Sequence, residues 1–330
     1  MKRNNATILN IQGQLLLSKG KFSEAAQAFL NCLKISPDHY ESGIALSSLA
    51  DARGDRKAAR AILHQVARSH PIIWEGRPDP HKPTILRIRG IEDSVYRIVQ
   101  KSDGTYTNVL RGGHFSIENL INRQQYNLMI LNILENNIDE LKNIPKFALL
   151  LNTIACPDRK RASLLAAARF VDRYPHLRVI NDPRRVLETT RDRNYLRLNM
   201  IPGVSFPKTE KIRWDGRSSE AVAREISGLG FVFPFIVRLV GSQTGSSVKL
   251  INNESELYSH FSASPTDKEY YVIQFQDYRN AKNVYNKTRV FFIDGNFYPV
   301  ANLFNDTWNV HSGDRYRVCL LYTSDAADDL

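Results

Sequence analysis

The first 73 residues repeat one pattern of small, apolar and helix-ending positions. Four kinds of position recur after 34 residues: Gly20 and Gly54, Ala25 and Ala59, Phe29 and Leu63, Pro37 and Pro71. A glycine suits the turn between helices, a small alanine lets helices approach, and a proline ends a helix. The pattern predicts two consecutive helical hairpins over residues 6–39 and 40–73.

This period and residue order resemble tetratricopeptide repeats. The glycine typical of the first helix is present as Gly13, whereas the matching position of the second unit is Ser47. Two repeats are fewer than the three usual for a free-standing stack, so we expect the pair to dock on the rest of the chain or on a partner protein. A pair of helical hairpins outside that family is the alternative.

Four prolines within residues 71–83 interrupt the helical pattern and predict a semi-rigid linker at 74–83. Strands are then predicted at Thr84–Arg89, Ser94–Gln100, Tyr106–Arg111, Phe147–Ile154 and Val179–Asn181. Helices are predicted at Arg159–Tyr174, from Pro183, and over 117–135, where six apolar residues share one side: Ile117, Leu120, Ile121, Leu128, Leu131 and Leu134. The alternation indicates a parallel, Rossmann-type α/β domain over 84–199.

From about residue 200 the pattern is one of strands with two short helices. The helices are predicted at Ser219–Gly228 and Glu254–Phe261, and the strands at Pro234–Val240, up to Leu250, and at Tyr270–Phe275, Thr288–Ile293 and Tyr298–Leu303. The pair Asp294-Gly295 between the last two strands is a strong hairpin signal. We assign residues 200–318 to a further α+β domain.

The composition is that of a soluble globular protein. The chain has 330 residues, 42% hydrophobic and 24% charged, which suits two or three domains. It has neither a secretory signal nor an apolar run of about 18 residues, so no membrane span is expected. The cysteines Cys32, Cys156 and Cys319 have no disulfide or metal spacing, which favours the cytoplasm.

The charge indicates an anionic partner. Lys and Arg number 45 against 34 Asp and Glu, a net charge of +11. Nucleic acid is not favoured as that partner, because no basic strand interleaved with aromatic residues and no recognition helix is present.

Residues 319–330, Cys-Leu-Leu-Tyr-Thr-Ser-Asp-Ala-Ala-Asp-Asp-Leu, resemble the in-frame translation of a transposase-type sequencing adapter. We therefore expect them to be an artefactual tail on a truncated natural chain, like the scar of an expression vector. A natural polar C-terminus is the alternative.

Between residues 179 and 300 the chain carries an ordered series of motifs. Val179-Ile-Asn-Asp-Pro183 precedes Asp192-Arg193, and Pro234-Phe-Ile-Val-Arg238 precedes the loop Gly241-Ser-Gln-Thr-Gly-Ser-Ser247. Tyr271-Val-Ile-Gln-Phe-Gln-Asp277 and Thr288-Arg289 follow. The order resembles the ATP-grasp superfamily, which includes glutathione synthetase, D-alanine–D-alanine ligase and the ribosomal-protein glutamate ligases. The resemblance covers about 84–318, and it is strongest to proteins that join tetratricopeptide repeats to such a domain.

The loop and the strand before it suit a triphosphate. Small residues at Gly241, Ser242, Gly245 and Ser246 would let backbone N–H groups approach phosphate oxygens. Arg238 lies on an otherwise apolar strand, where a cation without an adjacent anion is costly to bury. The resemblance implies that Arg238 contacts the α- or β-phosphate, in place of the usual lysine. A simple strand connection and an arginine at a sheet edge are the alternatives.

The resemblance implies further ATP contacts. Arg193 occupies the position of a second phosphate-binding lysine of the superfamily, and Lys249 follows the loop. Gln274, Phe275, Gln276 and Asp277 match the segment whose backbone binds adenine, with Asp277 at the ribose. Arg289 is the implied catalytic residue, because it would neutralise the transferred phosphate. Solvated surface cations at Arg193 and Arg289 are the alternatives. His311, in Trp308-Asn-Val-His311, is either a substrate contact or a surface-loop histidine.

The superfamily's Mg²⁺ ligands, an acidic residue and a later Glu-x-Asn, are missing before residue 318, which fits a truncation. The predicted fold class is α+β and multidomain: an N-terminal α-helical tetratricopeptide pair (1–73), a Rossmann-like α/β domain preceding the ATP-grasp region (84–199), and an incomplete ATP-grasp α+β domain (200–318).

The parent protein is then expected to be an ATP- and Mg²⁺-dependent ligase that joins a small-molecule or peptide carboxylate to an amine through an acyl phosphate. The repeats would dock a protein partner or the substrate, and the truncated chain would be inactive. The alternative is a non-catalytic interaction protein with tetratricopeptide repeats and a degenerate nucleotide-binding core.

Overall fold

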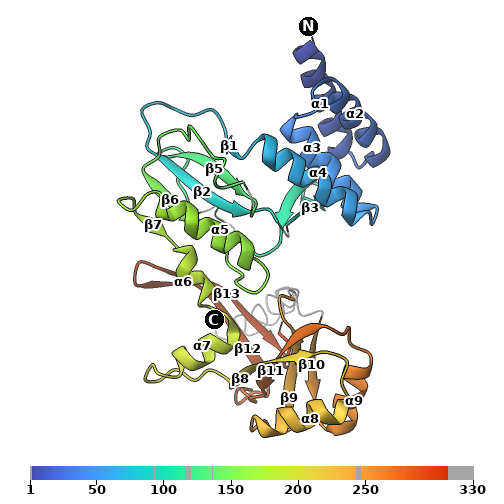
Figure 1. Ribbon diagram of the computed structural model, residues 1–330, viewed down its shortest axis with the longest axis vertical. Coiled ribbons are helices and arrows are strands. Elements are labelled where there is room, and N and C mark those ends of the chain that lie inside the picture. The colour runs from blue at the N-terminus through green and yellow to red at the C-terminus, as the bar shows by residue number, and fades with distance from the viewer. Residues whose placement is uncertain are drawn as a thin grey trace, which may run out of the picture. The chain divides into compact units, whose positions relative to one another are not determined.

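The computed structural model (Figure 1) describes residues 2–92, 94–115, 117, 120–135, 137–242 and 247–310. The chain forms two compact units, Met1–Thr190 and Arg191–Leu330, which we call unit 1 and unit 2. His311 and the expected tail, 319–330, lie outside the described residues. No helix in the described part of the chain is long and apolar enough to cross a membrane.

Four helices open unit 1: α1 (Lys2–Ser18), α2 (Phe22–Ile35), α3 (Tyr40–Ala52) and α4 (Arg56–Ser69). They confirm the predicted helical hairpins, while their identity as tetratricopeptide repeats stays a prediction. Gly20 and Gly54 make the turns at φ of 75° and 84°, a region that glycine enters without strain. Gly13 admits the buried Phe29 ring, since a Cβ there would lie 2.5 Å from Phe29 Cε1. The matching Ser47 instead donates a hydrogen bond of 2.7 Å to the Ala59 carbonyl oxygen.

A five-stranded sheet follows in unit 1, in the order β1 (Ile72–Trp74), β5 (Asn127–Ile133), β2 (Thr84–Gly90), β6 (Leu149–Asn152) and β7 (Val179–Ile180). The last four strands are parallel, as expected for an α/β layer, and β1 is antiparallel at the edge. The helix α5 (Arg161–Asp172) packs Leu164 and Phe170 against Leu86 and Ile88 on one face. The short α6 (Pro183–Leu187) begins at Pro183, as predicted.

The helix predicted over 117–135 is wrong, because its second half is strand β5. Leu128 and Leu131, placed on one side of that helix, lie on opposite faces of the sheet and in different apolar clusters. A strand covered on both faces has no polar alternation, so its apolar residues also fit a helical spacing. The strand β1 was not foreseen either, since it lies where the proline-rich segment begins.

The other face of this sheet meets the helices. The predicted strands at Ser94–Gln100 and Tyr106–Arg111 are confirmed as β3 (Val95–Gln100) and β4 (Tyr106–Arg111), which form an antiparallel hairpin apart from the parallel sheet. Tyr96 shares an apolar cluster with Ile44 of α3, Leu63 and Val66 of α4, and Leu134. The helices therefore pack on the α/β part of the same unit. The predicted domain limits at 73, 83 and 199 remain predictions.

Unit 2 begins with α7 (Arg191–Leu198) and contains an antiparallel sheet in the order β10 (Val248–Ile251), β9 (Phe235–Leu239), β11 (Lys268–Gln274) and β8 (Thr209–Trp214). The helices α8 (Ser219–Gly228) and α9 (Glu254–Ser262) cover one face, packing on Phe235 and Val237.

A long hairpin of β12 (Tyr285–Ile293) and β13 (Asn296–Asn305) completes the unit. Its turn has positive φ at Asp294 and Gly295, as the sequence predicts.

Candidate functional site

The sheet of unit 2 carries a cavity of about 480 Å³, which we call the cationic cavity. Ile236 and Arg238 of β9 alternate with Phe235 and Val237, so they lie on the face opposite α8 and α9. Fourteen side chains line it: Arg191, Pro207, Ile236, Arg238, Val248, Ile273, Gln274, Phe275, Gln276, Tyr278, Lys287, Arg289, Trp308 and Asn309.

Four of the lining residues are cations, namely Arg191, Arg238, Lys287 and Arg289, and no carboxylate is among the described lining residues. Burial lowers the pKa of Lys287, and the positive charges of Arg289, Arg191 and Arg238 lower it further. The Lys287 ammonium donates a hydrogen bond of 3.3 Å to the Val310 carbonyl oxygen. The cavity is therefore a concentration of positive charge that an anion would relieve.

Arg238 ties the strand to the loop that follows it. Its Nε donates to the Ser242 hydroxyl at 3.2 Å, and its Nη2 donates to the Ser242 carbonyl oxygen. Gly241 turns the chain there with φ of 74°. Gly245 and Ser246, the other loop residues of the predicted phosphate contact, lie outside the described residues.

The chain at the end of β11 forms another wall of the cationic cavity. The Gln274 amide donates to the carbonyl oxygens of Val232 and Pro234, both at 3.0 Å, and accepts from the Val232 N–H at 3.2 Å. A glutamate could not donate either bond, which explains why glutamine fits here. The Phe275 ring meets Trp308 edge-on, with centroids 6.2 Å apart.

Asp277 forms its hydrogen bonds outside this wall of the cavity. Its carboxylate accepts from Arg279 Nε at 2.9 Å, and that bond holds the Asp277 pKa below its usual range. Asp277 is not among the residues that line the cationic cavity, although its neighbours Gln276 and Tyr278 are.

The structure brings five predicted site residues together in the cavity: Arg238, Gln274, Phe275, Gln276 and Arg289. Gly241, Ser242 and Asp277 are described but do not line it, and two further predicted residues lie elsewhere. Lys249 pairs with Val237 across the sheet and therefore lies on the face that α9 covers. Burial is the larger cause of the lowered pKa of His260, and the charge of Lys249 lowers that pKa further. Arg193 is an exposed residue of α7 outside the lining, and Arg191 of that helix lines the cavity instead.

Sequence reasoning missed Arg191 and Lys287. Arg191 and Arg193 are two positions apart on a helix, roughly 200° around its axis, so only one can face a given wall. The sequence contains no signal that decides between them. Lys287 and Arg289 are also two apart, but on a strand, where that spacing places both on one face. This alternation was a signal for Lys287.

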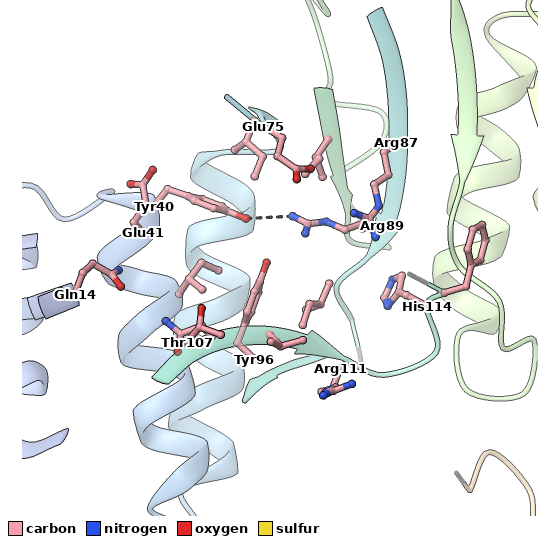
Figure 2. Close-up of a pocket in the computed structure, with 17 residues that line it drawn as sticks. Gln14, Tyr40, Glu41, Glu75, Arg87, Arg89, Tyr96, Thr107, Arg111 and His114 are labelled. Atoms are coloured by element: carbon pink, nitrogen blue, oxygen red, sulfur yellow. Dashed lines mark hydrogen bonds between the residues drawn. The ribbon is translucent and has the colours of Figure 1, made fainter. Parts of the chain in front are cut away.

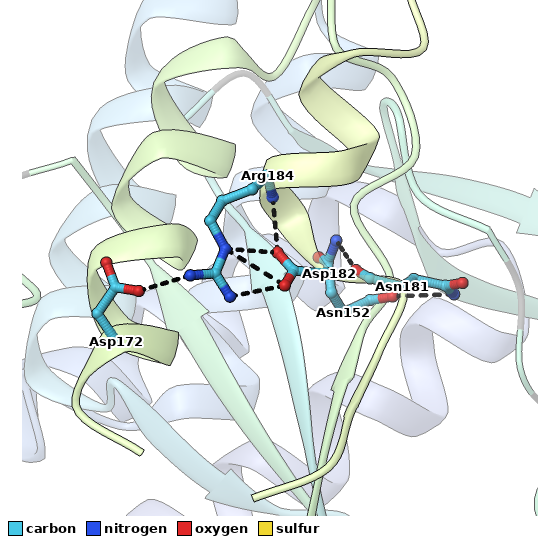
Figure 3. Close-up of polar contacts among 5 residues, drawn as sticks. All are labelled: Asn152, Asp172, Asn181, Asp182 and Arg184. Carbon is cyan, nitrogen blue, oxygen red and sulfur yellow. Dashed lines mark hydrogen bonds and ion pairs between the residues drawn. The ribbon is translucent and has the colours of Figure 1, made fainter. Parts of the chain in front are cut away.

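The first predicted motif, Val179–Pro183, forms a polar cluster in unit 1 (Figure 3). Asp182 caps α6, accepting from the Arg184 N–H at 2.9 Å, and Arg184 Nη1 also binds Asp172 at 2.8 Å. The Arg184 hydrogen bonds hold the Asp182 pKa below its usual range. Asn152 donates to the Asn181 carbonyl oxygen at 2.9 Å. These contacts join the ends of β6 and β7 to α6, a structural role.

A divalent metal has no ready site in the described part of the chain. No group of three or more His, Cys, Asp or Glu side chains that could hold a metal ion occurs among these residues. Among its described lining residues, the cationic cavity offers no carboxylate oxygen for Mg²⁺. Its donor set fits an anion and does not fit a metal ion.

No family model and no curated protein matches the chain significantly. Solved structures overlap with it at low similarity. D-alanine–D-alanine ligase from Bacillus anthracis is 11% identical, covers 68% of this chain and 72% of its own, and gives a TM-score of 0.35. VanG D-Ala:D-Ser ligase from Enterococcus faecalis is 11% identical, with coverages of 72% and 80% and a TM-score of 0.40. A RimK domain ATP-grasp protein from Sphaerobacter thermophilus is 15% identical, with coverages of 50% and 59% and a TM-score of 0.33. At TM-scores this low, these likenesses assign neither fold nor function.

Proposed function

We propose that unit 2 binds ATP in the cationic cavity, as part of an ATP-dependent ligase that activates a carboxylate as an acyl phosphate for attack by an amine. One observation carries the proposal: Arg191, Arg238, Lys287 and Arg289 line one cavity with no carboxylate among the described lining residues. Four like charges at close quarters repel each other, and a triphosphate would neutralise them.

The two walls suit the two ends of a nucleotide. The cations of β9 and β12 would hold the phosphates, with Arg289 beside the phosphate that is transferred. Beyond the end of β11, no backbone hydrogen bond among the described residues uses the N–H groups of Phe275 and Gln276. Those groups would be available to a base, and the Phe275 and Trp308 rings would cover its planar surface.

The chemistry would depend on positioning and charge. Guanidinium groups neutralise the charge that develops on the phosphoryl oxygens, and none of the lining residues needs to form a covalent intermediate. Mg²⁺ would have to enter together with the nucleotide, because the described lining residues offer it no carboxylate ligand. The helical hairpins of unit 1, if they are tetratricopeptide repeats, would recruit a protein or peptide that carries the carboxylate or amine.

The test is Mg²⁺-dependent release of ADP from ATP by the full chain, with a panel of small and peptide carboxylates and amines. ADP release that requires both a carboxylate and an amine, and that is lost in Arg289→Ala, would support ligation. The matched control is Arg213→Ala, an exposed β8 cation paired with Asp267 at 3.6 Å. Binding of ATP without any acceptor-dependent ADP release would support the nucleotide site and agree with the inactivity expected of a truncated chain, whereas absence of ATP binding would contradict the proposal.

A further inference from the structure

Unit 1 contains a second cavity, of about 600 Å³, which lies on the face of the five-stranded sheet opposite α5. We call it the arginine-floored cavity (Figure 2). Arg87 and Arg89 of β2 lie on its floor, Tyr40 and Glu41 of α3 on one wall, and residues of the β3–β4 hairpin on another. Its size is in the range typical of small-molecule pockets.

The floor buries positive charge. Arg87 and Arg89 are only 9% and 8% exposed, and they point from the same face of one strand. Arg89 Nη2 donates to the Asn132 side-chain oxygen at 3.1 Å and to the Tyr40 hydroxyl at 3.4 Å. Burial raises the pKa of Tyr40, so that hydroxyl is neutral. No ion pair joins Arg89 to a carboxylate within the described ranges.

One buried donor on this floor is unsatisfied. Arg89 Nε has no hydrogen-bond partner. Burial, together with the charges of Lys160, Arg89 and Arg87, lowers the pKa of His114 to about 3, so its imidazole is neutral. Its Nε2 accepts from the Gly90 N–H at 3.0 Å, which leaves the proton on Nδ1, and a hydrogen bond with the Gly112 backbone partly offsets the fall in the His114 pKa. Leaving a buried cation without an anion is costly unless a ligand supplies the acceptor.

The carboxylates that line the cavity do not pair with Arg89 on its floor. Glu75 pairs with Arg123 at 2.6 Å, and Glu41 lies 3.5 Å from His39. Both are exposed, so they lie at the mouth. The remaining wall is largely apolar, with Ile44, Val109, Leu110 and Ile130. The cavity thus combines buried N–H donors with a hydrophobic body.

We propose that the arginine-floored cavity binds a small organic molecule with an oxyanion head group, a carboxylate or a phosphate, whose oxygens accept from Arg89. A guanidinium fork matches either head group, and the apolar wall would hold the body of the ligand. This site is separate from the proposed ATP site, because all of its residues belong to unit 1.

The experiment uses three probes with one ring and different head groups: phenyl phosphate, benzoate and the uncharged benzamide. Saturation-transfer NMR on the full chain should detect binding of at least one anion and not of benzamide. Stronger binding of phenyl phosphate or of benzoate would identify the head group. Absence of binding by both anions would overturn the proposal.

Arg89→Met distinguishes a ligand-binding arginine from a structural one. It should weaken anion binding by about tenfold or more and leave the melting temperature of the ligand-free chain equal or higher, since it removes a buried, unpaired charge. A lower melting temperature with unchanged anion binding would show that Arg89 is structural and contradict the proposal. If Arg89→Met does not fold, Arg111→Glu at the exposed mouth decides: several-fold weaker binding supports the site, and unchanged binding overturns it.

Two controls locate the bound probe. Arg97→Met alters an exposed β3 arginine that pairs with Asp51 at 3.5 Å and does not line the cavity, so anion binding should not change. Arg238→Ala disables the cationic cavity of unit 2 and should also leave the unit 1 signal intact. Loss of the signal in Arg238→Ala, with retention in Arg89→Met, would assign the probe to unit 2 and overturn the proposal.

Discussion

The cationic cavity and the arginine-floored cavity both gather arginines, but at different depths. In the cationic cavity of unit 2 the cations lie on a hairpin strand, a helix and a sheet face, and Arg289 is exposed. In the arginine-floored cavity of unit 1, Arg87 and Arg89 are almost fully buried, and the carboxylates among the described lining residues, Glu41 and Glu75, are exposed. Water partly screens the repulsion between the more exposed charges of unit 2, whereas a buried guanidinium without a carboxylate partner among the described residues, as at Arg89, costs several kcal/mol. The burial of the cations therefore determines which ligand suits each cavity. A highly charged ligand would stabilise the cationic cavity of unit 2, and a single acceptor group would be enough for the arginine-floored cavity of unit 1.

The largest expected effect concerns the phosphate contacts of unit 2. Arg238→Ala and Arg289→Ala should each weaken ATP binding by about 1.5–3 kcal/mol, the range for a hydrogen bond to a charged group. Calorimetric titration of each variant would measure the loss. Arg279→Ala is the control, since Arg279 pairs with Asp277 and does not line the cavity. An equal loss in all three variants would point to general charge attraction rather than specific contacts.

Two glycine-to-alanine substitutions, one in each unit, test how closely the helices are packed. Gly13→Ala in α1 should lower the free energy of unfolding by about 1–3 kcal/mol, because its Cβ would overlap the fully buried Phe29 ring. Gly228→Ala in α8 has open space around the added methyl, and should be neutral or stabilising by up to about 1 kcal/mol. Urea unfolding monitored by circular dichroism would report both. Equal effects would show that α1 is not held against Phe29.

Gln274→Glu tests the wall of the cationic cavity. The carboxylate would face the carbonyl oxygens of Val232 and Pro234 without a donor, so we expect a loss of about 1–3 kcal/mol in unfolding free energy. Gln276→Glu adds the same charge two residues away, at a position without these bonds, and should change stability little. If the two variants unfold alike, the Gln274 amide does not support the wall.

The smallest effect is a pH dependence from Lys287. Its pKa is lowered in the folded chain, so the unfolded chain binds more protons between the two pKa values, and stability rises with pH through that window. An anionic ligand would raise this pKa again, so ATP affinity should fall a few-fold as pH rises toward the ordinary lysine range. Lys287→Arg keeps its charge and should flatten the profile. A wild-type profile that is flat, or that matches Lys287→Arg, would remove Lys287 from the site.

Local signals in the sequence predicted most of the elements. Asp294-Gly295 predicted the β12–β13 turn, and the periodicity of Ser219–Gly228 predicted α8 with its observed limits. The prediction for the β5 segment was wrong because a strand buried on both faces has no alternation of apolar and polar residues to distinguish it from a helix. Arg191 could not be separated from Arg193, since the choice depends on how α7 packs against the sheet.

The arginine-floored cavity had no sequence signal at all. Arg87 and Arg89 read as polar positions of an alternating strand, and their burial comes from helices and a hairpin that are distant in the chain. Only the fold brings Tyr40, Tyr96 and His114 around them. Contacts of this kind are set by tertiary packing and not by local pattern.

The central claim, that the cationic cavity of unit 2 holds a triphosphate, is tested most directly by titrating the chain with ATP, ADP, AMP and adenosine at one ionic strength. Charge attraction to Arg191, Arg238, Lys287 and Arg289 predicts that affinity falls with each phosphate removed, and that Arg289→Ala removes most of the difference between ATP and ADP. Equal affinity for ATP and adenosine, or a difference between ATP and ADP that Arg289→Ala leaves unchanged, would contradict it.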